Sequence, residues 1–336
     1  MIKRNSKLMN KNYPFLLKPA GKDYLWGGNR LNEDFKKNID MDPLAETWEC
    51  STHPDGQSYI ASGEYTGKKL RDVLKKHPEF LGTHPKSNGD LPILVKFIDA
   101  KKDLSVQVHP DDEYAFKYEN GQLGKTEMWY VLDATKDAAL VYGFKYNMNK
   151  SDIKKSIKDG TIEKYLNKVS VKKGDLFYIT PGTVHAIGAG ALIAEIQENS
   201  NLTYRLYDYN RVDKNGKLRQ LHIDKALDVL NVNAAKELKQ TGRIFIHKNG
   251  LSSEFLFRCK YFEVYKENVN TQNIRQLYKF KTSSNSFHTL LCVDGCGIIM
   301  YDKESIPFFK GDCIFVPANS VEIRMHGIAS FLNISC

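Results

Sequence analysis

Short strand-like segments, separated by glycine and proline, make up most of this chain of 336 residues. Such segments favour sheets that close into barrels or sandwiches, because each short strand must be buried against its neighbours. We therefore predict a mainly β fold, a barrel or a sandwich, with a few helices inserted or packed alongside. The predicted strands occupy residues 92–109, 127–131, 139–142, 175–180, 192–197 and 203–207, and strands resume from about residue 252 to the end.

Three segments have the apolar spacing of amphipathic helices. Residues 69–77 carry apolar side chains at Leu70, Val73 and Leu74 and are followed by Pro78, which stops the helix, and residues 223–230 place apolar side chains three or four positions apart. Residues 151–166 fit a longer helix with Ser151 as its N-cap, although Gly160 favours two shorter helices. We expect these helices to be a minor part of the fold.

A weak internal repeat is visible in the chain. Residues 173–181, Lys-Gly-Asp-Leu-Phe-Tyr-Ile-Thr-Pro, resemble residues 310–317, Lys-Gly-Asp-Cys-Ile-Phe-Val-Pro, apart from a gap of one residue. Two related β domains would explain this similarity. The first copy continues to His185, whereas the second has Val321 or Glu322 at that place. We therefore expect the second domain to lack a metal ligand that the first domain offers.

The formal net charge is +9, from 49 lysines and arginines against 40 acidic residues. The lysines are scattered, so we expect a solvated surface and no nucleic-acid partner, although a positive chain would attract a small anionic substrate. No apolar run approaches the roughly 20 residues that cross a bilayer. The first seven residues carry charges without the apolar stretch of a secretory signal. We expect a cytoplasmic protein without a membrane partner.

Six cysteines are present, and no two of them have the spacing CxxC. Four lie in apolar, strand-like segments, at positions 259, 292, 296 and 313. We therefore expect reduced thiols in the core, and neither a zinc ribbon nor a disulfide framework.

Ser105, Gln107 and His109 alternate along a predicted strand that has Val106 and Val108 between them. Alternate residues of a strand share one face, so the three polar side chains would point one way and the valines the other. This pattern is typical of a pocket wall, and it is also found on exposed sheet faces.

Two further segments carry side chains suited to the same site. Lys125 and Glu127 share a strand face by the same argument, and His185 follows a turn after an apolar strand. With Gln107 and His109, the chain offers two imidazoles, one carboxylate and one amide oxygen. This set suits Zn²⁺ with a position left open for substrate or water. The unequal spacing means that the site would be assembled from separate strands.

A polar face is also predicted on the strands at residues 192–197 and 203–207. Glu195 and Gln197 share one face of the first strand. Arg205 alternates with Thr203 and Tyr207 on the second. Arg205 suits an oxyanion or a phosphate, because its guanidinium presents a fixed fork of donors. The alternative is a structural ion pair between Glu195 and Arg205.

Four motifs in this order resemble the type I mannose-6-phosphate isomerases, and more narrowly their short bacterial form. The resemblance is strong over roughly residues 13–235, and the last 90 or so residues match only in length and β character. The motifs are Gln-Val-His-Pro-Asp-Asp at 107–112, Gly-Lys-Thr-Glu-Met-Trp-Tyr at 124–130, Pro-Gly-Thr-Val-His-Ala at 181–186 and Glu-Ile-Gln-Glu-Asn-Ser-Asn-Leu-Thr-Tyr-Arg-Leu-Tyr-Asp-Tyr at 195–209, with support from Trp-Gly-Gly at 26–28, Ala-Glu-Thr-Trp at 45–48 and Leu-Pro-Ile-Leu-Val-Lys at 91–96.

The resemblance implies a cupin-type double β-barrel that interconverts mannose 6-phosphate and fructose 6-phosphate through a cis-enediolate. Residues 1–245 would form the catalytic barrel with its elaborations, and residues 246–336 a cupin-like barrel without metal. The implied ligands of the single Zn²⁺ are Gln107, His109, Glu127 and His185. The implied catalytic residues are Arg205, Glu195 and Lys125, and the implied substrate-binding residues are Lys96, Ser105, Lys125 and Arg205.

Other functions remain open from the residues alone. One alternative is a non-catalytic sugar-binding cupin that keeps the metal. Others are a metal-dependent oxygenase or a different sugar-phosphate isomerase on the same barrel. The amide ligand Gln107 favours zinc over the iron of oxygenases, which use two histidines and one carboxylate. We expect a monomer, and the sequence does not identify the general base.

Overall fold

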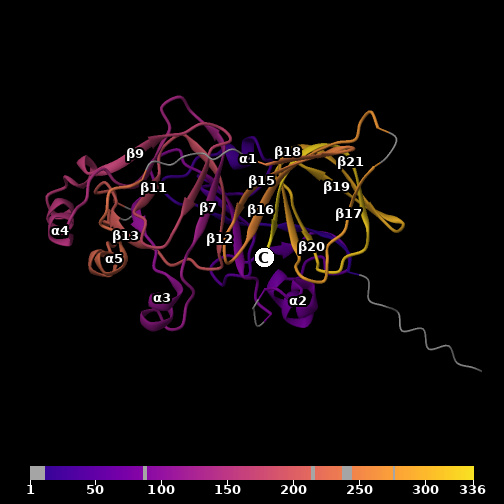
Figure 1. The fold of residues 1–336 in the computed structure, drawn as a ribbon, viewed down its shortest axis with the longest axis horizontal. Helices are drawn as coiled ribbons and strands as arrows, with labels where there is room; N and C mark the ends of the chain where they lie inside the picture. The colour runs from indigo at the N-terminus through magenta and orange to yellow at the C-terminus, as the bar shows by residue number, and fades with distance from the viewer. Residues whose placement is uncertain (1–11, 86–88, 213–215, 237–243, 275–276) are drawn as a thin grey trace, which may run out of the picture. The chain divides into compact units, whose positions relative to one another are not determined.

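The computed structural model describes residues 12–85, 89–212, 216–236, 244–274 and 277–336. Strands predominate throughout and helices are few, so the predicted mainly β fold is confirmed (Figure 1). No helix in these ranges is long and apolar enough to cross a membrane. The contacts divide the chain into two compact units: unit 1 contains the described parts of Met1–Lys18, Tyr59–Asp90 and Ile244–Cys336, and unit 2 contains those of Pro19–Ser58 and Leu91–Arg243.

Unit 2 is built from two antiparallel sheets. Side chains of both sheets, among them Ile98, Trp129 and Ile187, meet in one hydrophobic cluster. The six-stranded sheet has the order β10(Leu176–Ile179)-β7(Glu127–Ala134)-β12(Ala191–Glu198)-β5(Ile93–Asp99)-β3(Glu46–Cys50)-β2(Ala20–Lys22). The five-stranded sheet has the order β13(Tyr204–Tyr207)-β6(Val106–Val108)-β11(His185–Ile187)-β8(Ala139–Phe144)-β9(Leu166–Ser170).

The strand predicted over residues 92–109 is in fact two strands in different sheets. β5 belongs to the six-stranded sheet and β6 to the five-stranded sheet, and the chain crosses between them over residues 100–105. This crossing brings polar residues of one continuous segment into both walls of unit 2.

The helices of unit 2 are short. Ile153 of α4 and Leu227 of α5 join Val106 and Val108 in a second hydrophobic cluster, so these helices pack against the valine face of β6. The helices are α1(Arg30–Glu33), α3(Asp112–Tyr118), α4(Lys150–Lys158) and α5(Ile223–Val229), with a 3₁₀ turn at Ile162–Lys164.

The predicted division of residues 151–166 at Gly160 is confirmed, since α4 ends at Lys158 and Gly160 has a φ of 67°. The predicted N-cap is wrong. Asn149 caps α4, because its backbone is extended and its side chain accepts a hydrogen bond of 2.8 Å from the amide of Asp152.

Unit 1 contains a single antiparallel sheet. Its path is β14(Phe245–Lys248)-β15(Leu251–Arg258)-β16(Glu263–Asn270)-β21(Ile323–Ser335)-β18(His288–Tyr301)-β20(Cys313–Val316)-β1(Phe15–Lys18)-β4(Tyr59–Ile60). Two more strands extend it, β17(Tyr278–Phe280) on β21 and β19(Glu304–Phe309) on β18. The predicted helix at residues 69–77 appears as α2(Leu70–Lys76), followed by a 3₁₀ turn at Pro78–Leu81.

The two compact units are not divided at one point of the chain, whereas the predicted domains are residues 1–245 and 246–336. β1 pairs with β20, and β4 pairs with β1, so N-terminal residues group with the C-terminal strands. Antiparallel pairing joins residues about 300 positions apart, as between Phe15 and Phe315.

The internal repeat corresponds to the same local structure in both units. Gly174 and Gly311 both have positive φ, 92° and 101°, and each begins a turn that leads into a strand. In both turns the next aspartate accepts a hydrogen bond from the amide three residues earlier, Asp175 at 2.9 Å and Asp312 at 2.8 Å. The repeated Gly-Asp therefore encodes a turn before a strand.

The cysteines form no disulfide. Cys50, Cys292 and Cys313 are buried as predicted, but Cys296 is exposed. The sequence around Cys296 in β18 is apolar, and such a sequence does not show which face of the strand is exposed to solvent.

Candidate metal centre and active-site cavity

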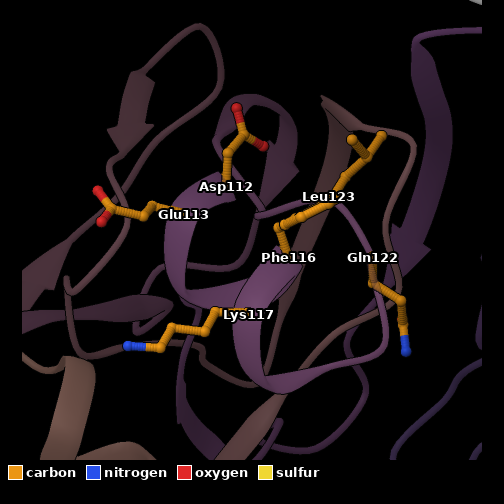
Figure 2. A pocket seen from close by; sticks show the side chains of 6 residues that line it. All are labelled: Asp112, Glu113, Phe116, Lys117, Gln122 and Leu123. Atoms are coloured by element: carbon orange, nitrogen blue, oxygen red, sulfur yellow. The ribbon is translucent and has the colours of Figure 1, made fainter.

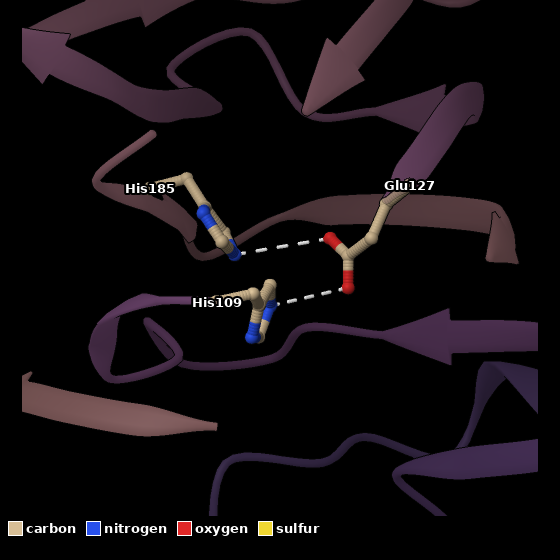
Figure 3. A group of neighbouring side chains, drawn as sticks. All are labelled: His109, Glu127 and His185. Carbon is tan, nitrogen blue, oxygen red and sulfur yellow. Dashed lines mark ion pairs between the residues drawn. The ribbon is translucent and has the colours of Figure 1, made fainter. Parts of the chain in front are cut away.

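Four polar residues from both sheets of unit 2 converge at one point. Gln107 lies in β6, His109 directly after it, and His185 begins β11, where it pairs with Gln107. Glu127 begins β7 in the other sheet. Figure 3 shows the two imidazoles on one side and the Glu127 carboxylate facing them. We call these four residues the ligand cluster.

The distances within the ligand cluster are short. His109 Nε2 lies 3.2 Å from Glu127 Oε1, and His185 Nε2 lies 3.8 Å from Glu127 Oε2. The Gln107 amide lies 3.3 Å from His185 Nε2. One ligand atom from each histidine and from Glu127 can be chosen so that all three lie within 4.8 Å of one another. Ligand atoms at this separation can surround one small cation.

The protonation of the two histidines suits metal binding. Burial lowers the pKa of His185, and burial together with Lys125 lowers that of His109 to about 3. His185 Nδ1 lies 2.8 Å from the carbonyl oxygen of Thr183, which fixes the proton on Nδ1 and leaves the lone pair on Nε2. Both imidazoles are therefore neutral and can donate a lone pair.

The Glu127 carboxylate supplies the test of whether a cation fits. Burial raises the pKa of Glu127, but Lys125 and His109 lower it more, so it stays well below its usual range. Both carboxylate oxygens are buried and make no hydrogen bond with the described residues, although Lys125 forms an ion pair with one of them. Among the described residues, Lys125 pairs only with Oε1, while Oε2 faces the neutral His185 at 3.8 Å, and such a buried oxygen is costly unless a second cation meets it. The ligand cluster therefore fits a divalent metal.

A cavity of about 270 Å³ adjoins the ligand cluster. The cavity is lined by Gln107 of the ligand cluster and by Lys125, which pairs with Glu127, whereas His109, Glu127 and His185 do not line it. Every other predicted site residue is at the wall. The lining comprises Tyr24, Trp26, Glu46, Lys96, Ile98, Leu104, Ser105, Gln107, Lys125, Ile187, Glu195, Asn201, Thr203, Arg205 and Arg219.

A larger hollow, of about 760 Å³, lies against α3 and contains no predicted site residue. Figure 2 shows its side chains pointing in different directions, with Glu113 and Lys117 turned away from Gln122 and Leu123. Side chains that do not converge offer no reaction site. The smaller cavity beside the ligand cluster is therefore the candidate active site.

Lys96 is held between two carboxylates at the cavity wall. Its Nζ lies 2.9 Å from Glu195 Oε1 and 3.9 Å from Glu46 Oε2. An indole N–H donates to each carboxylate, from Trp129 at 2.9 Å and from Trp48 at 2.8 Å. Burial lowers the pKa of Lys96, but Glu195 and Glu46 raise it more, so it lies above its usual value. Lys96 is therefore a permanent cation, and the ion-pair partner of Glu195 is Lys96, not Arg205.

Arg205 reaches the cavity from β13. Its Nε donates to Ser105 Oγ at 3.2 Å and its NH1 to the carbonyl of Gln220 at 2.8 Å. Thr203 lines the same cavity, but Tyr207 lies in the hydrophobic cluster with α4 and α5. A β-bulge between Arg205 and Tyr207 shifts the strand register, so the predicted alternation stops at Arg205.

Comparison with known proteins identifies the family. The family model described as "Phosphomannose isomerase type I, catalytic domain" matches residues 15–137, and "Mannose-6-phosphate isomerase, cupin domain" matches residues 252–335. The chain is 39% identical to mannose-6-phosphate isomerase ManA of Bacillus subtilis, over 94% of this chain and 96% of that protein. The chain belongs to the type I phosphomannose isomerase family.

Other relatives agree with this family. Mannose-6-phosphate isomerase of Streptococcus mutans is 36% identical over 90% of this chain and 92% of that protein. The crystal structure of the mannose 6-phosphate isomerase from Bacillus subtilis matches with a TM-score of 0.87 and 34% identity, over 96% of this chain and 99% of that chain. The predicted membership and the cupin-type fold are confirmed.

A mannose 6-phosphate isomerase bound with zinc and yttrium matches with a TM-score of 0.72, over 96% of this chain and 98% of that chain. At 18% identity this likeness concerns the fold alone.

Sequence reasoning missed four polar residues of the cavity wall: Tyr24, Glu46, Asn201 and Arg219. Glu46 and Trp48 alternate on β3, so their shared face was a usable signal, but the motif at residues 45–48 was given no role. Tyr24 and Arg219 lie outside regular strands and helices, where no periodicity reports a direction. Their positions at the cavity depend on the folded loops.

Proposed function

We propose that the cavity interconverts mannose 6-phosphate and fructose 6-phosphate by moving a proton between C1 and C2 of the sugar through a cis-enediolate. The family and the residues at the cavity wall support this reaction. The observation that carries the proposal is the buried Glu127 carboxylate, which faces two neutral imidazoles. Gln107, His109, Glu127 and His185 would hold one zinc ion per chain.

Zinc at this place would supply a Lewis acid that stabilises negative charge on the sugar oxygens. Side chains of the cavity would bind the substrate and stabilise charge during the reaction. Lys96 and Ser105, which line the cavity, would bind sugar hydroxyls. Lys125 and Arg205 would add positive charge beside the developing enediolate. Lys125 is held by its ion pair with Glu127, and Arg205 by its hydrogen bond to Ser105.

Proton transfer needs a group that can lose and regain a proton at the reacting carbons. Arg205 does not suit this task, because a guanidinium stays charged near neutral pH. Lys96 is locked as a cation between two carboxylates. Among the proposed catalytic residues, Glu195 and Lys125 remain as carriers of the proton.

The proposal is tested by coupling fructose 6-phosphate formation to a dehydrogenase assay, using protein with measured metal content. We expect turnover that a chelator abolishes and that added Zn²⁺ restores. A non-catalytic sugar-binding cupin would bind the sugar phosphate without turnover. The assignment of catalysis to residues 1–245 and of a metal-free barrel to residues 246–336, the monomeric state and the cytoplasmic location remain predictions.

A further inference from the structure

We propose that Arg219 binds the phosphate group of the substrate and thereby selects a phosphorylated sugar over the free sugar. The inference rests on the proposed function, because it names the part of the same cavity that receives the anionic end of the substrate. Arg219 lies in the segment between β13 and α5. Its side chain lines the cavity together with Arg205.

The order of residues along the wall separates Arg219 from the ligand cluster. Arg205 pairs with Gln107 across β13 and β6, so it stands directly beside a residue of the cluster. Arg205 NH1 in turn holds the carbonyl of Gln220, the residue after Arg219. Arg205 therefore lies between the cluster and the segment that carries Arg219. A hexose 6-phosphate has the same polarity, with its reacting carbons at one end and its phosphate at the other.

Both guanidiniums keep donors available for a ligand. Among the described residues, the hydrogen bonds of Arg205 use Nε and NH1, which leaves NH2. Among the residues that the structure describes, Arg219 hydrogen-bonds only through NH1, at 3.4 and 3.5 Å from the two carboxylate oxygens of Asp208. Its Nε and NH2 are then available for a phosphate, which a guanidinium can bind through two parallel hydrogen bonds.

The side chains around Arg219 carry an excess of positive charge, which favours binding of an anion. Asp208, 4% exposed at its side chain, forms ion pairs with both Arg211 and Arg219. Among the described residues Arg205 makes no ion pair, although the charges of Arg219, Asp208 and Arg211 all act on it. The pKa of Arg205 is lowered to about 10, first by burial and next by the charge of Arg219. A phosphate bound between the two arginines would remove this repulsion.

The chain offers a matched control in Arg211. It carries the same charge and binds the same Asp208, but it does not line the cavity. Neutralising Arg211 therefore changes the charge of the cluster without removing a donor from the cavity. Arg219→Lys provides a second comparison, because it keeps the charge and loses the fork of donors.

The experiment measures kinetics with mannose 6-phosphate and binding of inorganic phosphate to the zinc-loaded protein. For Arg219→Gln we expect KM for mannose 6-phosphate and the dissociation constant of inorganic phosphate to rise by about 10-fold or more, as for loss of a charged hydrogen bond. Zinc content and melting temperature should match the wild type. Arg219→Lys should be intermediate, and Arg211→Gln should stay within about threefold of the wild type.

Two results would overturn the inference. One is unchanged phosphate affinity and KM in Arg219→Gln, and the other is an equal loss in Arg211→Gln, which would indicate a general field effect. The binding arm separates this inference from the proposed function. If the wild type lacks isomerase activity yet binds inorganic phosphate through Arg219, the reaction fails and the anion site stands.

Discussion

Lys96 and Glu195 face each other on neighbouring strands and form a buried ion pair, with 2.9 Å between Nζ and Oε1. Glu46 and two indole groups complete the arrangement. The pair thus presents a fixed cation and a fixed carboxylate at the cavity wall, and it constrains which residue can carry a proton.

Glu195→Gln tests this pair. The substitution keeps an acceptor for Trp129 but leaves Lys96 as a buried charge with only the more distant Glu46. Breaking a buried pair on one side destabilises a protein by about 3–5 kcal/mol. We expect a loss of this order in urea unfolding, together with loss of turnover. The double variant Lys96→Met/Glu195→Gln should recover much of the stability but not the activity. An unaltered unfolding free energy in the single variant would contradict the arrangement.

Arg205→Lys tests a role in the reaction. The variant keeps a positive charge but loses the planar fork that donates to Ser105 and Gln220. We expect turnover to fall by about 100-fold or more, roughly 2.7 kcal/mol in the barrier, as for loss of one preorganised donor. Steady-state kinetics on protein with a full complement of zinc measures the effect. Wild-type turnover would assign Arg205 to structure alone.

Glu198 makes stability depend on pH. Burial and the neighbouring Asp112 raise its pKa to about 7, from 4.5 for an ordinary glutamate. The folded state therefore holds a proton that the unfolded state releases at lower pH. Stability is greatest below about 4.5 and falls as pH rises toward 7, by on the order of 3 kcal/mol for this group.

Glu198→Gln isolates that contribution. The amide oxygen can still accept the hydrogen bond that the Thr126 amide now donates to Glu198, at 2.8 Å. We expect the variant to gain stability relative to the wild type at pH 8 and to differ little at pH 4.5. Urea unfolding at both pH values measures the difference. The same gain at both pH values would refute a titrating Glu198.

Much of the site could be predicted from the sequence, because successive side chains of a regular strand point to opposite faces of the sheet. Ser105 and Gln107 line the cavity while Val106 and Val108 lie in the core, as their alternation requires. Lys125 and Glu127 likewise meet at one point. Residues whose direction depends on a regular strand could therefore be placed without a structure.

Predictions from this alternation fail where the backbone departs from a regular strand. The β-bulge after Arg205 places Tyr207 in the core, and no residue of that segment is a sequence signal for a bulge. Arg219 reaches the cavity from outside any regular strand or helix and pairs with Asp208, and β1 pairs with a strand about 300 residues away. These features depend on tertiary contacts, so they could be recognised only in the folded structure.

The ligand cluster is proposed to bind the metal on which the reaction depends. His109→Ala removes one imidazole, and Arg324→Gln, at an exposed position of unit 1, is a matched control for handling. The most direct measurement is zinc per chain, by elemental analysis, alongside mannose 6-phosphate turnover in the same samples. We predict about one zinc and full turnover in the wild type and the control. His109→Ala should have less than a tenth of each while it unfolds as cooperatively as the wild type. Full turnover of His109→Ala without metal would contradict the account.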